Sequence, residues 1–168
     1  KGSILDGLKR TKVSYWGMVT AHIGVAICII GVGLTSVYSV QRDVRILPGE
    51  NISLANYQFE FVAIEPHEGH NYIADQATVL VTKKNSTIAL LKPQKRRYFS
   101  SGQTMTEASI DSSIFRDLYI ALGEPLQGDA WAIRIYIKPF VMWIWIGALF
   151  IAMGAVLASL DGRFKKIQ

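Results

Sequence analysis

Cysteine is almost missing from this 168-residue chain, which contains one, Cys28. A single thiol cannot build an internal disulfide framework, and without a C-x-x-C pair there is neither a dithiol redox motif nor a c-type haem attachment motif. The sequence also has no P-loop, no G-x-G-x-x-G fingerprint and no set of Ser, His and Asp that suggests a catalytic triad. These absences argue against a disulfide-stapled domain and against a nucleotide-binding enzyme.

Charged side chains are missing from two long stretches, residues 13–40 and residues 139–160. The first has twenty-eight residues and the second twenty-two, and a helix needs about 20 apolar residues to cross the hydrocarbon core of a bilayer. Tyr15 and Trp16 lie where aromatic side chains mark the headgroup level. Each stretch is therefore predicted to be a transmembrane helix.

The first predicted helix carries one ionisable side chain, His22. Burial of an unpartnered imidazole in lipid costs free energy, so a histidine at this depth is expected to have a role. It could ligate a metal or haem iron, relay protons, or hydrogen-bond a neighbouring helix, and this helix alone leaves all three open. Small residues line one side of the helix at spacings of four and three: Gly17, Ala21, Gly24, Cys28, Gly31 and Thr35. This seam lets another helix or a flat ligand approach the backbone, and we expect His22 at its border.

The formal charge of +5 is concentrated at the two ends of the chain. Residues 42–138 hold eleven basic and eleven acidic side chains, whereas basic residues dominate 1–12 and 161–168. That distribution follows the positive-inside rule and argues against a nucleic-acid partner. We therefore expect both ends to be cytoplasmic. No signal peptide is recognisable after the initial Lys-Gly-Ser, so we expect the start to be internal to a longer chain.

Between the two stretches, residues 41–138 change to short alternating patterns. Period-two runs rich in β-branched and aromatic residues predict strands at 52–54, 57–61, 77–81 and 131–136. Turn-forming clusters separate them, among them 48–49, 66–71, 83–86, 100–102 and 123–129. The predicted fold class is a membrane protein in which two transmembrane α-helices flank a compact all-β extracytoplasmic domain, barrel-like or sandwich-like.

Three further segments of this domain contain clustered histidine or charged residues. His67 and His70 have acidic neighbours, but two ligands in a Pro- and Gly-containing loop are a weak metal signal, and a solvated hairpin tip is the simpler interpretation. The basic segment 92–98 could pair with phospholipid headgroups or haem propionates, although a solvated strand explains it as well. Segment 104–111 is expected to form a hydrogen-bonded β corner.

The order of these pieces resembles the C-terminal end of the CcmF family, the large membrane subunits of bacterial cytochrome c maturation. The resemblance covers nearly the whole chain but only the end of the family's length. It rests on several short motifs of this sequence: Trp16 to Met18, Ala21 to Ala26, Arg42 to Val44 with Pro48-Gly49, Lys95 to Tyr98, Met105 to Ala108 with Ile110-Asp111, Arg116 to Tyr119, and Lys138 to Phe140.

The resemblance implies a part in a haem lyase complex. CcmF-like proteins act with CcmH and CcmI, receive haem from the chaperone CcmE and promote its attachment to apocytochrome c. They also hold a b-type haem among their membrane helices, thought to reduce the incoming haem, and the histidine in the A-H-x-G-V-A setting is one axial ligand. That role falls on His22, as the ligand of the haem iron. The implied location is the bacterial inner membrane, with the β domain in the periplasm.

The family's tryptophan-rich WWD segment and the second ligand of the membrane haem lie upstream of this sequence. The resemblance therefore implies no catalytic residue here, gives no role to His67 or His70, and implies that this segment alone is not a competent lyase. Two alternatives stay open. One is a membrane-anchored β docking module without haem, and the other is the paralogous lyase that serves formate-dependent nitrite reductase.

Overall fold

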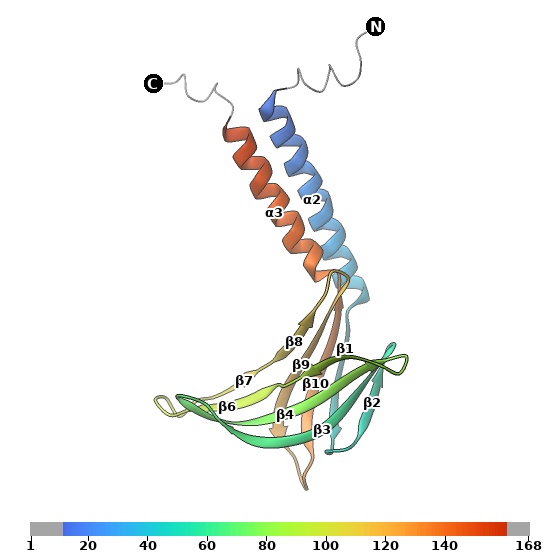
Figure 1. Cartoon of the computed structure of the whole chain (residues 1–168), viewed down its shortest axis with the longest axis vertical. Coiled ribbons are helices and arrows are strands. Elements are labelled where there is room, and N and C mark those ends of the chain that lie inside the picture. Colours follow the sequence, from blue (N-terminus) through green and yellow to red (C-terminus); the bar gives the residue numbers. More distant parts are fainter. Residues whose placement is uncertain (1–11, 161–168) are drawn as a thin grey trace. The chain divides into compact units, whose positions relative to one another are not determined.

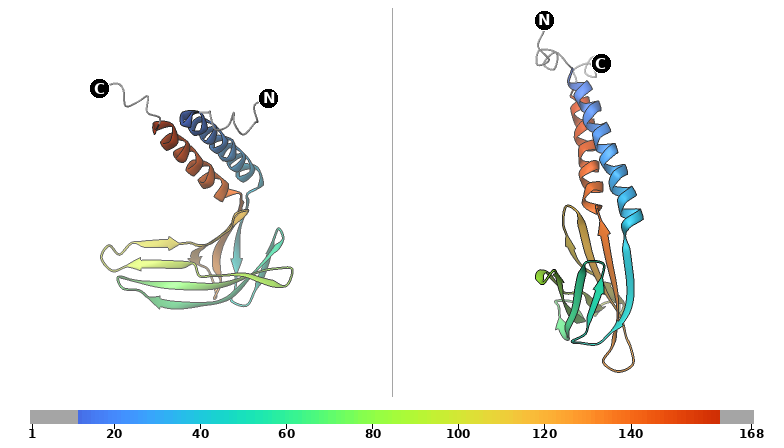
Figure 2. Two further views of the ribbon diagram at one scale, coloured as in Figure 1. Left: turned by 45° about the horizontal axis from the view of Figure 1, so that its top comes forward. Right: turned by 90° about the vertical axis from the view of Figure 1, so that its right-hand side faces the viewer.

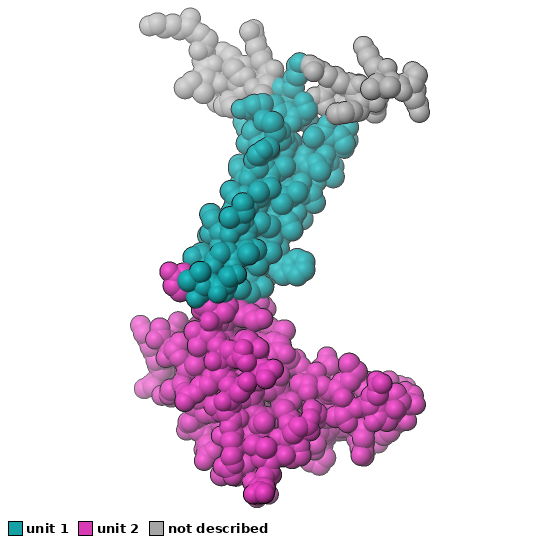
Figure 3. Space-filling model, turned by 180° about the vertical axis from the view of Figure 1, so that it is seen from behind, with its two compact units in different colours: residues 1–37, 140–168 teal, residues 38–139 magenta. Residues whose placement is uncertain are grey.

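The computed structural model describes residues 12–160. The chain divides into two compact units, a helical unit that contains residues 13–37 and 140–160 and a β unit of residues 38–139 (Figure 3). The terminal residues 1–11 and 161–168 lie outside the described part, and with them nearly all of the expected cytoplasmic basic segments.

The helical unit consists of α2 (Val13–Tyr38) and α3 (Val141–Ser159), which run side by side (Figure 2). With 26 and 19 residues, both are long and apolar enough to span a membrane. Helix α2 ends two residues before the predicted boundary, because the chain is already paired in a strand at Val40. The fold is thus that of a membrane protein in which two apolar helices flank a β domain.

Glycines hold the two helices together. Gly17, Gly24 and Gly31 are the buried residues of α2, and Gly147 and Gly154 are those of α3. A Cβ on Gly24 would lie 2.6 Å from the carbonyl oxygen of Gly147, and a Cβ on Gly154 would lie 2.5 Å from that of Gly17. The glycines recur every seven residues, the period that keeps one face against a partner helix. The seam predicted from the sequence is therefore a helix-packing seam, and α3 fills it.

The β unit has two antiparallel sheets (Figure 1). The four-stranded sheet has, in spatial order, β1 (Val40–Ile46), β10 (Trp131–Pro139), β9 (Arg116–Pro125) and β8 (Ser109–Ser112). The six-stranded sheet has the order β2 (Asn51–Leu54), β3 (Tyr57–Glu68), β4 (Tyr72–Lys83), β6 (Gln94–Tyr98) and β7 (Thr104–Glu107), with β5 (Ser86–Leu91) also paired to β4. All four predicted strand segments are confirmed, while β1, β5 and β9 were not predicted.

The hydrophobic core lies between the sheets. Alternate residues of β3, Phe59 and Phe61, are buried at 1% and 0% exposure and pack in one cluster with residues of β9 and β10 such as Leu118, Ile120 and Ile135. This is the period-two burial that a half-covered antiparallel sheet requires. The chain passes from one sheet to the other at Ala108, between β7 and β8, so the predicted β corner is confirmed.

Two turn predictions are wrong in part. The turn expected at 123–129 begins only after Pro125, because strand β9 continues to that residue. Residues 66–71 were expected to be a loop, but strand β3 continues through Pro66, His67 and Glu68, and only the next three residues turn. Pro66 is tolerated because β2 pairs only with 57–60 of β3, so at Pro66 the strand has β4 on one side and no neighbour on the other.

Candidate functional site

The ring of His22 is oriented by a hydrogen bond within its own helix. Its Nδ1 lies 2.8 Å from the carbonyl oxygen of Met18, one turn earlier. A carbonyl oxygen can only accept, so Nδ1 carries the proton and donates it. In the neutral ring the other nitrogen, Nε2, is then an unprotonated acceptor that points away from the helix backbone. An imidazole whose Nδ1–H bonds a backbone carbonyl is the form in which Nε2 ligates metals.

The ring lies on an exposed, apolar face of α2. His22 is exposed, and Met18, Val25 and Ile29, which share its face at helical spacing, are exposed by 48%, 43% and 67%. In a bilayer such a face contacts lipid or another helix, and Nε2 lies among apolar side chains. A single acceptor in these surroundings is suited to one metal ligand bond or one hydrogen bond from a neighbour.

The expected relation of His22 to the glycine seam is wrong. His22 is two residues from Gly24, which at about 100° per residue places it on nearly the opposite side of the helix. The small-residue side is occupied by α3, whose backbone approaches Gly17 and Gly24 too closely for a flat ligand to fit between. Any planar ligand of His22 must therefore lie on the outer face, away from α3.

The other two histidines are far from a metal-binding arrangement. His67 is in β3 with its ring 6.4 Å from that of Tyr72, and His70 is exposed in the following turn. Among residues 12–160, no group of three His, Cys, Asp or Glu side chains could hold a metal ion. His70 thus lies at the tip of the β3–β4 hairpin, and His67 lies in the strand that leads to it.

The basic segment 92–98 is mostly strand β6, and two of its cations have partners within the domain. Lys95 Nζ lies 2.5 Å from a carboxylate oxygen of Glu124, and the Arg96 guanidinium lies 4.4 Å from the ring centre of Tyr72. Lys95 and Arg97 line a groove of about 560 Å³ that also contains Glu68. Cations and carboxylates are mixed there, so the groove does not have the positive charge that an anionic ligand needs.

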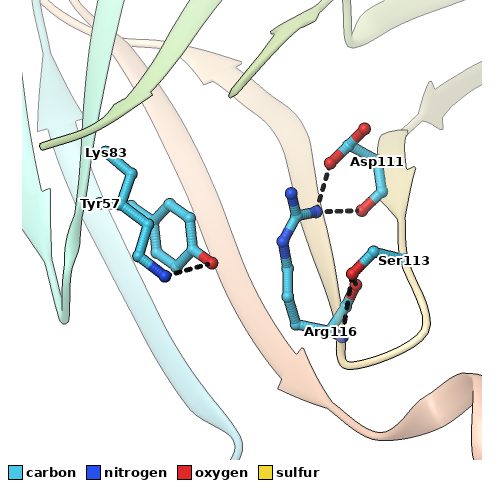
Figure 4. A network of polar contacts seen from close by, with 5 residues as sticks. All are labelled: Tyr57, Lys83, Asp111, Ser113 and Arg116. Carbon is cyan, nitrogen blue, oxygen red and sulfur yellow. Dashed lines mark hydrogen bonds and ion pairs between the residues drawn. The ribbon is translucent and has the colours of Figure 1, made fainter. Parts of the chain in front are cut away.

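A second polar cluster was not anticipated from the sequence (Figure 4). The ring of Tyr57, which is 9% exposed, has Lys83 Nζ 4.8 Å and the Arg116 guanidinium 5.7 Å from its centre. Arg116 also forms an ion pair with the carboxylate of Asp111 and donates to its backbone carbonyl oxygen at 2.8 Å. Arg116 and Asp111 stand in two of the motifs noted above, but a sequence motif does not reveal which residues pair across strands.

Comparisons with known proteins match the β unit and extend over most of the chain. Residues 37–139, which include the whole β unit, match the family model described as "CcmF C-terminal beta-sandwich". The cytochrome c-type biogenesis protein CcmF of Pseudomonas aeruginosa is 48% identical over 96% of this chain and 25% of its own length, and that of Escherichia coli is 45% identical over 94% and 24%. The chain thus spans about a quarter of the length of these relatives.

Two other matches bear on the interpretation. The cytochrome c-type biogenesis protein NrfE of Haemophilus influenzae is 31% identical over 94% of this chain and 25% of its own length. A solved structure described as "Cytochrome c Heme Lyase CcmF" superposes with a TM-score of 0.73 over 86% of this chain and 24% of its own, at 14% identity. At that identity the superposition supports the fold.

Proposed function

This chain belongs to the CcmF family, and from that premise we propose that it is the C-terminal part of a cytochrome c haem lyase subunit and that His22 is an axial ligand of a b-type haem between membrane helices. The observation that carries the proposal is the state of the imidazole. Its Nδ1–H donates a hydrogen bond to the Met18 carbonyl oxygen, which leaves Nε2 as the acceptor nitrogen on the outer face of α2.

The residues present fit one side of a haem. A neutral histidine is an ordinary axial ligand of haem iron, and the hydrogen bond from Nδ1 to the Met18 carbonyl oxygen fixes the orientation of the ring. The apolar side chains of Met18, Val25 and Ile29 suit a macrocycle face and exclude water. When bound, the haem supplies one-electron redox chemistry, and its potential is set in part by this ligand.

The second ligand must come from outside this chain. The remaining histidines, His67 and His70, are in the β unit, so neither α2 nor α3 offers another. The three quarters of the relatives' length that this chain does not match leave ample sequence for that ligand and for the site that handles incoming haem. This is why we propose that the chain is not competent alone.

The proposed partners follow from the family. They are CcmH, CcmI, haem-loaded CcmE and apocytochrome c, together with the rest of the subunit and the lipid bilayer. We place the protein in the bacterial inner membrane with residues 41–138 in the periplasm, because the basic residues of 1–12 and 161–168 favour the cytoplasm at both ends. Residues 13–40 and 139–160 are then the two spans.

The two alternatives are weaker. Identity is 45–49% to CcmF proteins of pseudomonads and E. coli but 31–32% to the NrfE proteins, which favours the CcmF branch. A β docking module without haem would not need a histidine in the first helix whose ring is fixed by a hydrogen bond and faces outward.

The test is the absorption spectrum of the intact protein with His22→Ala. We expect loss of the b-type Soret and α bands, or their return when imidazole is added, because exogenous imidazole can fill the vacated coordination position. His67→Ala and His70→Ala are matched controls and should leave the spectrum unchanged. An unaltered spectrum together with normal cytochrome c assembly in His22→Ala would make the histidine a structural residue and defeat the proposal.

A further inference from the structure

The hairpin between β8 and β9 has an apolar tip. Its turn, residues 113–116, carries Ile114 and Phe115, whose exposed fractions are 58% and 62%. Two large apolar side chains in succession at the tip of a loop are costly in water, and polar residues are the usual choice there. The β9–β10 turn at the other end of the same strands carries one such residue, Leu126, at 41%.

The strand register places this tip at the end of the sheet that leads to a membrane helix. Arg116, the first residue of β9, is the register partner of Pro139, the last residue of β10. The chain leaves the sheet at that point and begins helix α3 at Val141. Ile114 comes two residues before Arg116, so the tip is at the same end of the sheet as Pro139, where the chain continues into α3.

Ser113 and Arg116, the polar residues of the turn, have partners within the hairpin (Figure 4). The Ser113 amide and hydroxyl both donate to the carbonyl oxygen of Arg116, each at 2.9 Å, and the Arg116 amide donates to the Ser113 hydroxyl at 3.2 Å. The Arg116 guanidinium is held by Asp111, which also neutralises its charge. A turn built in this way can leave bulk water without stripping these groups of hydrogen bonds.

We propose that the β8–β9 tip inserts Ile114 and Phe115 into the headgroup and acyl-chain boundary of the outer leaflet. Apolar side chains at the end of the sheet that connects to a span, on a turn whose arginine is paired internally, have the chemistry of an interfacial anchor. The tip therefore gives the β domain a third attachment to the membrane besides its two helical connections. The inference rests on α3 crossing the bilayer, as proposed above, and is independent of haem binding.

The test places one nitroxide spin label at a time on the intact protein in phosphatidylcholine and phosphatidylglycerol vesicles, in a background without other cysteines that includes Cys28→Ala. The positions are Ile114→Cys, Leu126→Cys and Leu149→Cys. Leu126 is the matched control, an exposed apolar turn residue about 30 Å away along β9 at 3.3 Å per residue. Leu149, exposed by 59% on α3, reports whether that helix lies in lipid.

Collision with oxygen, which partitions into lipid, is compared with collision with a water-soluble nickel chelate. We expect oxygen to dominate at positions 114 and 149 and nickel to dominate at 126. If nickel dominates at 114 while oxygen dominates at 149, the tip is in water and the proposal is overturned. If both reagents are excluded at 114, the tip is covered by protein and the lipid assignment is equally overturned. If oxygen does not dominate at 149, the premise of a membrane-spanning α3 fails, and the tip proposal with it.

Discussion

Adding a single methyl group to the helix seam should separate α2 from α3. A Cβ on Gly24 would lie 2.6 Å from the Gly147 carbonyl oxygen and 2.7 Å from the Ile151 amide nitrogen, and both are backbone atoms that cannot rotate away. Ordinary contact begins at 3.4 Å, so the backbones must move apart by up to 0.8 Å, the difference between 3.4 and 2.6 Å. Overpacking of this kind costs about 1–3 kcal/mol.

Gly33→Ala is the matched control, because nothing lies within 4 Å of a Cβ at that position of the same helix. Alanine is preferred over glycine in a helix by about 0.5–1 kcal/mol, and this gain applies equally to both variants. The difference in stability between Gly24→Ala and Gly33→Ala therefore isolates the packing cost. We expect Gly33→Ala to be slightly more stable than the parent and Gly24→Ala to be less stable than Gly33→Ala by about 1–3 kcal/mol.

A double variant sharpens the test. A Cβ on Gly147 would lie 2.6 Å from the Gly24 carbonyl oxygen, so the same separation of backbones relieves both clashes. The double variant Gly24→Ala with Gly147→Ala should therefore lose less stability than the sum of the losses in the two single variants. The assay is an SDS titration in mixed micelles, followed by energy transfer between dyes on the adjoining ends of the two helices. Equal midpoints for Gly24→Ala and Gly33→Ala would refute the close approach.

Two further predictions concern the β unit and the orientation of the chain. Arg134 hydrogen-bonds Asp43 at 2.7 and 3.1 Å and lowers the pKa of that carboxyl, so Arg134→Gln should raise the Asp43 titration midpoint measured by carboxyl carbon NMR. A carboxyl whose pKa is lowered by folding stabilises the folded state at pH values above its ordinary pKa, and this stabilisation is lost as the pH falls through the folded pKa. The variant should therefore lose less stability than the parent when the pH is lowered below about 4. An unchanged midpoint would contradict the role of Arg134. In spheroplasts, an impermeant maleimide should label Lys84→Cys but not Lys165→Cys, and labelling of both from outside would exclude the proposed topology.

The sequence predicted those parts of the fold whose pattern is local. Strand β10 reads as a strand because Ile133, Ile135 and Ile137 alternate with more polar residues, and they are buried as that pattern requires. Strand β9 was missed because the residues between its buried leucines and isoleucine, Tyr119 and Ala121, are also largely apolar, which hides the alternation. A spacing of two between Leu118, Ile120 and Leu122 was the available signal.

The sequence indicated His22 as the candidate site residue but did not predict on which side of α2 its ring lies. The motif indicated His22, and the small-residue seam left open whether another helix or a flat ligand would fill it. The small residues from Ala21 to Gly31 lie within about a quarter turn of the helix surface, and the packing of Gly17, Gly24 and Gly31 against α3 shows that a helix fills this side. The hydrogen bond to Met18 is local and could have been anticipated, since a histidine in a helix can reach the carbonyl four residues earlier.

The pairing of β1 with β10 has a consequence for how the helices find each other. Val40 lies opposite Ile137, and these residues are close to the points where the chain leaves α2 and enters α3. Neighbouring strands are about 4.8 Å apart, so the two tethers start almost together although some hundred residues separate them in sequence. Once the sheet has formed, the two helix ends are held at a high effective concentration, as a short loop would hold them. The β domain is in this sense an insertion at a hairpin turn, and the helix pair is insensitive to how long or elaborate that insertion becomes.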